Sequence, residues 1–140
     1  MSFVGSYTHT LDSKKRVFIP AKFRDDLGEE FYITRKFDAY LSIYTAEDWE
    51  AYVEKISKLP EADADEFQDF ILGAAQKCVP DSNGRIILDD KLLKHAKIDK
   101  SLVFVGAGKQ IRVWSEAAWN EREQNRNYDK MRDIMRQYGL

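Results

Sequence analysis

The sequence predicts an α+β fold with a β-rich core, in which two internal repeats form a small β-barrel that carries a helical insert and a long C-terminal helix. Three observations lead to this fold. The chain of 140 residues contains two similar halves, its apolar runs have the length of β-strands, and two segments have the spacing of amphipathic helices. A chain of this length fits a single domain, 1–140, with its own core.

The repeat begins at a motif in which an aspartate stands four residues before an arginine. "LDSKKRVFIPAKF" (11–23) aligns with "PDSNGRIILDDKL" (80–92) at a separation of 69 residues. The identical pairs are Asp12 with Asp81, Ser13 with Ser82, Arg16 with Arg85 and Lys22 with Lys91. After a slip of one residue, 31–49 aligns with 101–119, and a tryptophan ends both stretches. The chain therefore contains two copies of one unit of about forty residues, related by a pseudo-twofold axis.

Each unit has the same expected order of elements. A strand precedes the Asp-x-x-x-Arg turn, and a short β-rich run follows it, "RVFIP" in the first unit and "RIILD" in the second. A helical turn comes next, and two further strands complete the unit, "EFYITRK" with "YLSIYT" and "SLVFVG" with "QIRVWS". Two such units that face each other can close a barrel and cover their strand edges.

A helical insert separates the two copies. Thr45 and Asp48 form a capping box, and the apolar residues that follow recur at helical spacing. These residues are Trp49, Tyr52, Val53, Ile56 and Leu59. A second helix follows Pro60, and the stretch 46–69 holds nine acids and two lysines.

The final segment is expected to be one helix that begins at Ser115. Its stretch "NEREQNRN" has no apolar residue, so this part cannot pack in a core of its own. The apolar residues beyond it indicate either docking on another subunit or a frayed helix in solvent. The expected parts of the chain are unit 1 at 5–49, the insert at 46–75, unit 2 at 76–120 and the C-terminal helix at 115–140.

Composition excludes several classes of function. Cys78 is the only cysteine, so the chain has no internal disulfide, and with two histidines it has no zinc-ligand spacing. "GAGK" at 106–109 lacks the spacing of a phosphate-binding loop, and no serine–histidine pair has local support. We therefore expect no enzyme, no metal and no cofactor. The sequence lacks a secretory signal and a membrane-spanning run, which indicates a cytoplasmic location with no membrane partner.

Positive charge gathers in the first unit, although the net charge of the chain is -2. Five basic residues fall within eleven positions: Lys14, Lys15, Arg16, Lys22 and Arg24. Such a cluster suits the phosphates of double-stranded DNA, and arginine can also bind guanine in the major groove. The second copy offers only Asn83 and Arg85, so we expect the first copy to dominate DNA binding. A solvated charged face is the alternative.

The two aspartates and a glycine are expected to shape these turns. The carboxylates of Asp12 and Asp81 can accept backbone N–H bonds in the turn and pair with the arginine, which is more plausible than a catalytic dyad. Asn83 followed by Gly84 is the strongest two-residue hairpin signal and places the second motif at a tight turn.

These residues together resemble the MraZ family. The resemblance rests on Phe3 and Gly5 near the start, on the two Asp-x-x-x-Arg motifs and on "IPAKFR" at 19–24, and it covers almost the whole chain. It implies a double-split, SpoVT-AbrB-like β-barrel with two units in one chain. One position departs from the family, because Lys15 stands where the first motif usually has glycine. A residue at positive φ is costlier without glycine there.

The resemblance also implies a function. Members of the family are bacterial transcriptional regulators that assemble into ring-shaped homo-oligomers, which we expect to be octamers or larger and associated with the nucleoid. They bind tandem repeats in the promoter of the division and cell-wall gene cluster, including their own gene, and usually repress it. Two other classes stay open: a protein–protein interaction module that uses the acidic insert, and an AbrB-type antitoxin, for which one swapped unit is expected.

Overall fold

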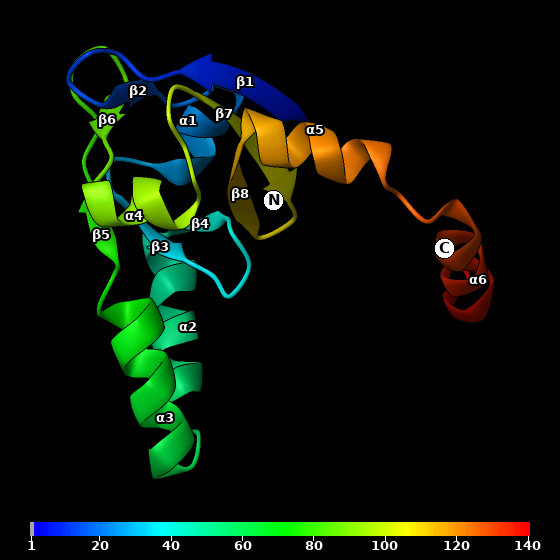
Figure 1. The fold of residues 1–140 in the computed structure, drawn as a ribbon. Helices are drawn as coiled ribbons and strands as arrows, with labels where there is room; N and C mark the ends of the chain where they lie inside the picture. The colour runs from blue at the N-terminus through cyan, green and yellow to red at the C-terminus, as the bar shows by residue number, and fades with distance from the viewer. Residues whose placement is uncertain (1) are drawn as a thin grey trace.

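The computed structural model describes residues 2–140 and shows two antiparallel sheets (Figure 1). A six-stranded sheet has the order β1-β7-β8-β4-β3-β5, and β2 pairs with β6 in a separate two-stranded ribbon. The strands are β1 Ser6–Thr10, β2 Arg16–Phe18, β3 Phe31–Arg35, β4 Leu41–Thr45, β5 Gln76–Cys78, β6 Arg85–Ile87, β7 Ser101–Ala107 and β8 Gln110–Ser115. Because β1 and β5 are the two ends of the larger sheet, the strands of residues 2–140 do not close into the expected barrel.

The two repeats exchange strands within the larger sheet. The first strand of repeat 1, β1, pairs with β7 of repeat 2, and β5 of repeat 2 pairs with β3 of repeat 1. The last strands of the two repeats, β4 and β8, pair in the middle. The order of the sheet is therefore the same from either end once each strand is replaced by its counterpart in the other repeat.

The ribbon has the same internal symmetry. Val17 pairs with Ile86 at its centre, and these two residues are counterparts 69 positions apart. The N–H of Ile19 donates to the carbonyl of Gly84 at 2.9 Å, and the N–H of Leu88 donates to that of Lys15 at 3.1 Å. These two bonds are also counterparts, so the pseudo-twofold axis expected from the repeat passes through the ribbon.

The main core lies between the larger sheet, the ribbon and two short helices, α1 (Ala21–Leu27) and α4 (Asp90–His95). Alternate residues of each strand face this core, and Ile33, Ile43 and Ile111 have no exposed surface. Apolar burial of this kind supplies most of the free energy of folding. The core therefore holds the ribbon from beneath and leaves its other face free.

The insert forms two helices that project from the body (Figure 1). These are α2 (Ala46–Ser57) and α3 (Glu61–Phe67), the latter continued by a π-helical turn, η1 (Gln68–Leu72). The Thr45 hydroxyl accepts the N–H of Asp48 at 3.1 Å, which confirms the predicted cap at the start of α2. A second hydrophobic cluster around Trp49, Ile56 and Ile71 fastens the insert to the larger sheet.

The C-terminal segment is two helices rather than the single helix expected. Helix α5 spans Glu116–Gln124 and α6 spans Tyr128–Tyr138. The break occurs because the Asn127 side chain accepts the N–H of Lys130 at 3.0 Å, and so caps a new helix. Ser115 caps α5 in the same way, through the N–H of Ala118 at 3.0 Å. No helix in the described chain is long and apolar enough to cross a membrane.

Candidate nucleic-acid interface

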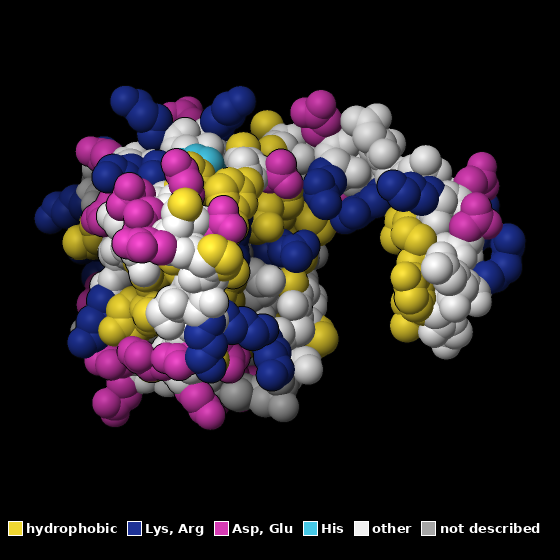
Figure 2. Space-filling model, turned by 90° about the horizontal axis from the view of Figure 1, so that it is seen from below, with side chains coloured by type: hydrophobic (Ala, Val, Ile, Leu, Met, Phe, Trp, Pro, Cys, Tyr) yellow, Lys and Arg dark blue, Asp and Glu magenta, His cyan; other side chains and the backbone are white. Residues whose placement is uncertain are grey.

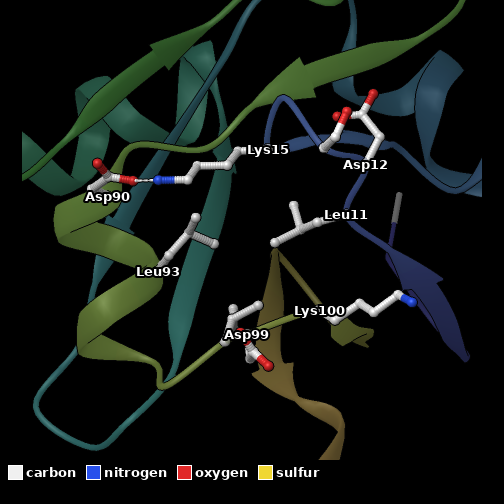
Figure 3. A pocket seen from close by; sticks show the side chains of 9 residues that line it. Leu11, Asp12, Lys15, Asp90, Leu93, Asp99 and Lys100 are labelled. Carbon is white, nitrogen blue, oxygen red and sulfur yellow. Dashed lines mark hydrogen bonds and ion pairs between the residues drawn. The ribbon is translucent and has the colours of Figure 1, made fainter.

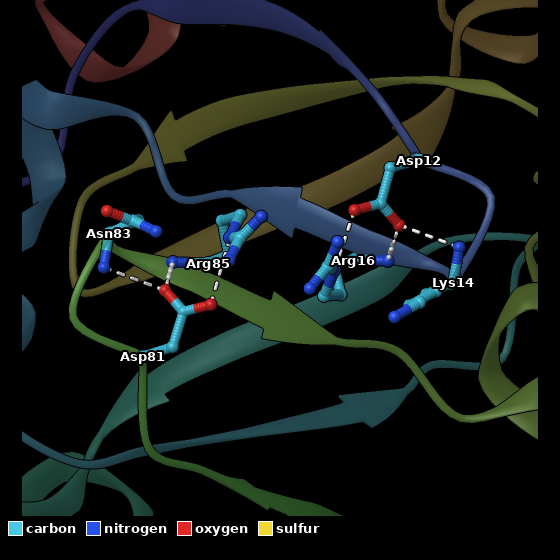
Figure 4. A network of polar contacts seen from close by, with 6 residues as sticks. All are labelled: Asp12, Lys14, Arg16, Asp81, Asn83 and Arg85. Carbon is cyan, nitrogen blue, oxygen red and sulfur yellow. Dashed lines mark hydrogen bonds and ion pairs between the residues drawn. The ribbon is translucent and has the colours of Figure 1, made fainter.

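One carboxylate holds the first Asp-x-x-x-Arg turn together (Figure 4). Oδ1 of Asp12 accepts the backbone N–H groups of Lys14 at 2.8 Å and Arg16 at 2.9 Å. Oδ2 accepts Nε–H of Arg16 at 2.7 Å. The Asp12 N–H in turn donates to the Arg16 carbonyl at 2.9 Å. These bonds fix both the turn and the direction of the arginine side chain.

The second turn repeats this arrangement at the other end of the ribbon. Oδ1 of Asp81 accepts the N–H groups of Asn83 and Arg85, and Oδ2 accepts Nε–H of Arg85, all at 2.9 Å. The backbone N–H of the arginine is the largest cause that lowers the pKa of each aspartate, and the charge of the arginine adds to it. Both carboxyl groups are therefore ionised at neutral pH.

The ribbon presents alternate side chains on its outer face. Val17 and Ile86 are buried beneath it. The outer face carries Arg16, Phe18, Arg85 and Ile87. Phe18 is 44% exposed and Ile87 57%, and the Arg85 guanidinium lies 5.8 Å from the centroid of the Phe18 ring. Phe18 and Ile87 were not named from the sequence as part of this surface. The alternation of residues in "RVF" and "RII" indicates that both side chains face outward.

Lys14 and Asn83 occupy equivalent places in the two turns, and both are exposed. Each donates its backbone N–H to the aspartate of its own turn, which leaves its side chain free at the edge of the ribbon. Lys22 is exposed on α1. The structure thus brings together on one side the two arginines, the lysine of the first turn and the asparagine of the second.

Lys15 does not extend with Lys14 toward this surface. Its φ is 61°, in the left-handed region, and Gly84 has a φ of 80° at the equivalent position. This backbone conformation directs the Lys15 side chain toward α4, where its ammonium pairs with Asp90 (Figure 3). The sequence grouped Lys15 with the DNA-binding side chains, whereas the structure holds it in an ion pair within the chain.

Arg24 also lies elsewhere than the sequence indicated. Because β2 and β6 are antiparallel, the end of β2 and the helix α1 that follows it lie against the second turn, not the first. Nε of Arg24 donates to the Ile19 carbonyl at 2.8 Å. Its guanidinium fills the space beside Gly84, where a Cβ would come within 2.7 Å of Cζ. Arg24 therefore packs against the second turn, and a side chain at position 84 would displace its guanidinium.

The site offers groups that can bind a ligand. Burial raises the pKa of the Cys78 thiol to about 12, so its reactive thiolate is absent at neutral pH. No group of three His, Cys, Asp or Glu side chains within 2–140 is placed to hold a metal ion. Two arginines fixed by carboxylates on a symmetric ribbon define the class instead: a two-repeat binding protein whose exposed face suits a polyanion.

Comparisons with known proteins agree with this class. A family model described as "MraZ protein, putative antitoxin-like" matches residues 2–69 and 71–136. "Transcriptional regulator MraZ" of Lachnoclostridium phytofermentans is 38% identical over 139 residues, which cover 99% of this chain and 98% of that protein. The protein of the same name from Caldanaerobacter subterraneus subsp. tengcongensis is 41% identical over 133 residues, covering 94% and 89%. The chain belongs to the MraZ family.

Family membership confirms three of the predictions. The resemblance drawn from the two motifs is correct, and the two matched segments confirm that the chain is built of two repeats. Both relatives are named transcriptional regulators, a non-enzymatic class, so the expectation that the chain is not an enzyme also holds.

Proposed function

We propose that this protein is a sequence-specific DNA-binding transcriptional regulator that contacts double-stranded DNA with the outer face of the β2–β6 ribbon. The observation that carries the proposal is the pair of equivalent turns that orient Arg16 and Arg85 on one exposed surface. The aspartates leave the terminal guanidinium nitrogens free, since only Nε of each arginine is bonded to them. Those nitrogens can bind guanine O6 and N7 or a phosphate in a bidentate manner.

The neighbouring side chains have different roles in this proposal. Lys14 and Lys22 neutralise phosphates, and Asn83 takes the place of Lys14 in the second turn without adding charge. We expect the first turn to contribute more affinity than the second because Lys14 stands in the turn itself, whereas Lys22 lies on α1, beside the second turn. Lys15 and Arg24 shape the two turns from within the chain, and Asp12, Asp81 and Gly84 set their backbone.

The promoter target and the assembly are further parts of the proposal. The relatives carry the name of transcriptional regulators, and we propose that this chain represses the division and cell-wall gene cluster, including its own gene, at the nucleoid in the cytoplasm. A single chain has few phosphate contacts, so it would bind weakly. Several linked chains on tandem repeats raise the effective concentration and make weak contacts selective.

Helix α6 supports assembly into a homo-oligomer, which we propose to be a ring of eight or more subunits. Its apolar residues form one continuous stripe (Figure 2). They are Tyr128, Met131, Ile134, Met135 and Tyr138, each between 40% and 68% exposed. A helix of 11 residues is marginal on its own in water, so this stripe needs a partner surface for the helix to be stable.

Fluorescence anisotropy on the promoter region of the gene tests the main proposal. The protein is titrated into a labelled duplex from that region and into a scrambled duplex, at two salt concentrations, together with Arg16→Ala. Lys58→Ala, on the insert and far in sequence from both turns, is the matched control for loss of one exposed charge. We expect selective, salt-sensitive binding that Arg16→Ala loses and Lys58→Ala keeps. Equal weak binding to both duplexes would mean that the ribbon is only a charged surface and does not select a DNA sequence.

A second function is favoured by one observation. The acidic helices α2 and α3 project from the body and are available to a basic protein partner (Figure 1). Partner binding that resists added salt while the promoter duplex fails to bind would support an interaction module, or an antitoxin, instead.

A further inference from the structure

A pocket of about 380 Å³ opens beside the second turn, on the side of α1. Its walls are mainly apolar and come from Ile19, Phe31, Val79 and Pro80, with Arg24 and Glu29 as the charged groups. Val79 is 65% exposed, so a large part of the apolar wall faces solvent. Pockets of this size, with apolar walls and a few polar groups, are typical of small-molecule sites.

Arg24 is the distinctive group of this pocket. It is partly buried, and its Nε–H donates to the Ile19 carbonyl at 2.8 Å. Within residues 2–140 no carboxylate forms an ion pair with it, although Glu29 lines the same pocket. A partly buried guanidinium without a counter-charge, next to apolar walls, is well placed to bind an anionic group.

The equivalent pocket of the other repeat lacks this feature (Figure 3). It measures about 560 Å³ and lies beside the first turn. Leu93 stands at the position of Arg24, 69 residues further along the chain. The Lys15 ammonium in this pocket is already paired with Asp90, and two further acids, Asp12 and Asp99, line it. The lining of this pocket carries three carboxylates, Asp12, Asp90 and Asp99, against the two ammonium groups of Lys15 and Lys100, so the pocket at Arg24 is better suited to an anion.

We propose that the pocket beside the second turn binds a small carboxylate with a short apolar body. The carboxylate contacts Arg24, and the apolar body packs on Val79 and Pro80. Glu29 makes a second negative charge on the ligand unfavourable, which selects a monocarboxylate over a phosphate dianion. The volume of the pocket limits the ligand to a small molecule and excludes a polymer.

The ligand would also act on DNA binding, and this part rests on the proposed function. The Arg24 guanidinium fills the space beside Gly84 in the turn that orients Arg85. A carboxylate that draws the guanidinium into the pocket removes this support from the turn. The ligand is then an effector that lowers DNA affinity through the second turn, while the first turn keeps its own ion pair.

Calorimetric titration of the full-length protein, without DNA, tests the pocket. The probes are hexanoate, octanoate, 1-hexanol and hexyl phosphate. We expect saturable binding of the two carboxylates, at least about tenfold weaker binding of the alcohol and the phosphate, and the same loss for carboxylates in Arg24→Gln. Arg24→Lys keeps the charge and should restore part of the affinity. Lys100→Gln removes a cation from the other pocket and should change nothing.

Three outcomes would overturn the proposal. The first is that neither carboxylate shows saturable binding, and the second is that hexanoate and hexanol bind equally. The third is that Lys100→Gln loses carboxylate binding while Arg24→Gln keeps it. Thermal unfolding of Arg24→Gln, together with Val79→Ser as a second variant at the apolar wall, separates a lost site from a lost fold. Val79→Ser should weaken octanoate more than hexanoate, since the longer chain covers more of the wall.

Anisotropy with the promoter duplex then tests the coupling. Saturating hexanoate should weaken DNA binding of the wild type several-fold and leave Arg24→Gln unchanged. Unchanged DNA affinity in the wild type would refute the effector role. If no duplex binds at all, the proposed function fails, whereas the calorimetric result still decides the pocket.

Discussion

The two Asp-x-x-x-Arg turns have the same backbone conformation but differ in the cation that lies beside them. In the first turn, Lys15 sends its side chain out to Asp90 on α4. In the second turn, Gly84 has no side chain, and Arg24 reaches in from α1 to fill the same space. Both turn residues have positive φ, 61° and 80°. The Asp–Arg pair and the turn are thus the constant part of the unit, and the residue before the arginine is free to differ.

The largest expected effect concerns which turn leads in DNA binding. Arg16→Ala should abolish selective binding, and Arg85→Ala should weaken it less, because Lys14 adds charge only to the first turn. A bidentate arginine–base contact is worth about 1–3 kcal/mol, roughly 5- to 150-fold in affinity. Anisotropy on one promoter duplex measures both variants. Equal losses would mean that the turns contribute alike, and an unaffected Arg16→Ala would exclude the ribbon as the interface.

The next effect concerns the crowding at Gly84. Gly84→Ala should lower the free energy of unfolding by about 1–3 kcal/mol, since it adds strain at positive φ and displaces Arg24. Gly108→Ala is the matched control, because its φ is 78° and no atom lies within 4 Å of the added Cβ. Urea denaturation of both variants separates the two causes. If they lose the same stability, Arg24 does not support the turn.

Low pH should reduce the contribution of both turns to the stability of the fold. The folded-state pKa values of Asp12 and Asp81 are lowered, chiefly by the backbone N–H groups of Arg16 and Arg85. The stabilisation is therefore present above the unfolded value of 3.8 and is lost as pH falls through the lower folded value. Between pH 5 and about pH 2 the wild type should lose more stability than Asp12→Asn or Asp81→Asn. Urea midpoints across this range measure the difference, and parallel curves would contradict it.

The smallest effect concerns the ion pair that only the first turn has. Lys15 and Asp90 are largely exposed, so Asp90→Asn should change stability by less than about 1 kcal/mol. The released lysine should add about one phosphate contact and steepen the salt dependence of DNA binding accordingly. Titrations at four salt concentrations measure this slope. A large loss of stability in Asp90→Asn would show that the Lys15–Asp90 pair is needed to hold the first turn.

Local pattern was enough to predict the two repeats and most of their elements. The aligned motifs located both turns, the strand-sized runs located the sheets, and Thr45 with Asp48 marked the start of α2. The aspartate-to-arginine spacing also indicated a turn held by a carboxylate. These features depend on residues a few positions apart, whose contacts follow from spacing alone.

Contacts between distant segments were not visible in the same way. Arg24 was placed with the first turn because it follows it in the chain, but antiparallel pairing of β2 with β6 carries α1 to the second. Closure of the barrel depended on whether β1 and β5 meet, which strand propensity does not decide. The break in the C-terminal helix depended on one asparagine, Asn127, that caps α6.

The exchange of strands between the repeats has a consequence for synthesis of the protein. Strand β1 ends at Thr10, and its partner β7 begins at Ser101, 91 residues later. A ribosome that adds roughly 5–20 residues per second takes about 5–18 s to make that stretch. During this time β1 has no partner, so the half of the sheet formed by β1, β7 and β8 is complete only after Ser115, whereas the half formed by β4, β3 and β5 is complete at Cys78. The ribbon that we propose for DNA binding is therefore fully supported from beneath only after the strands of the second repeat have been made.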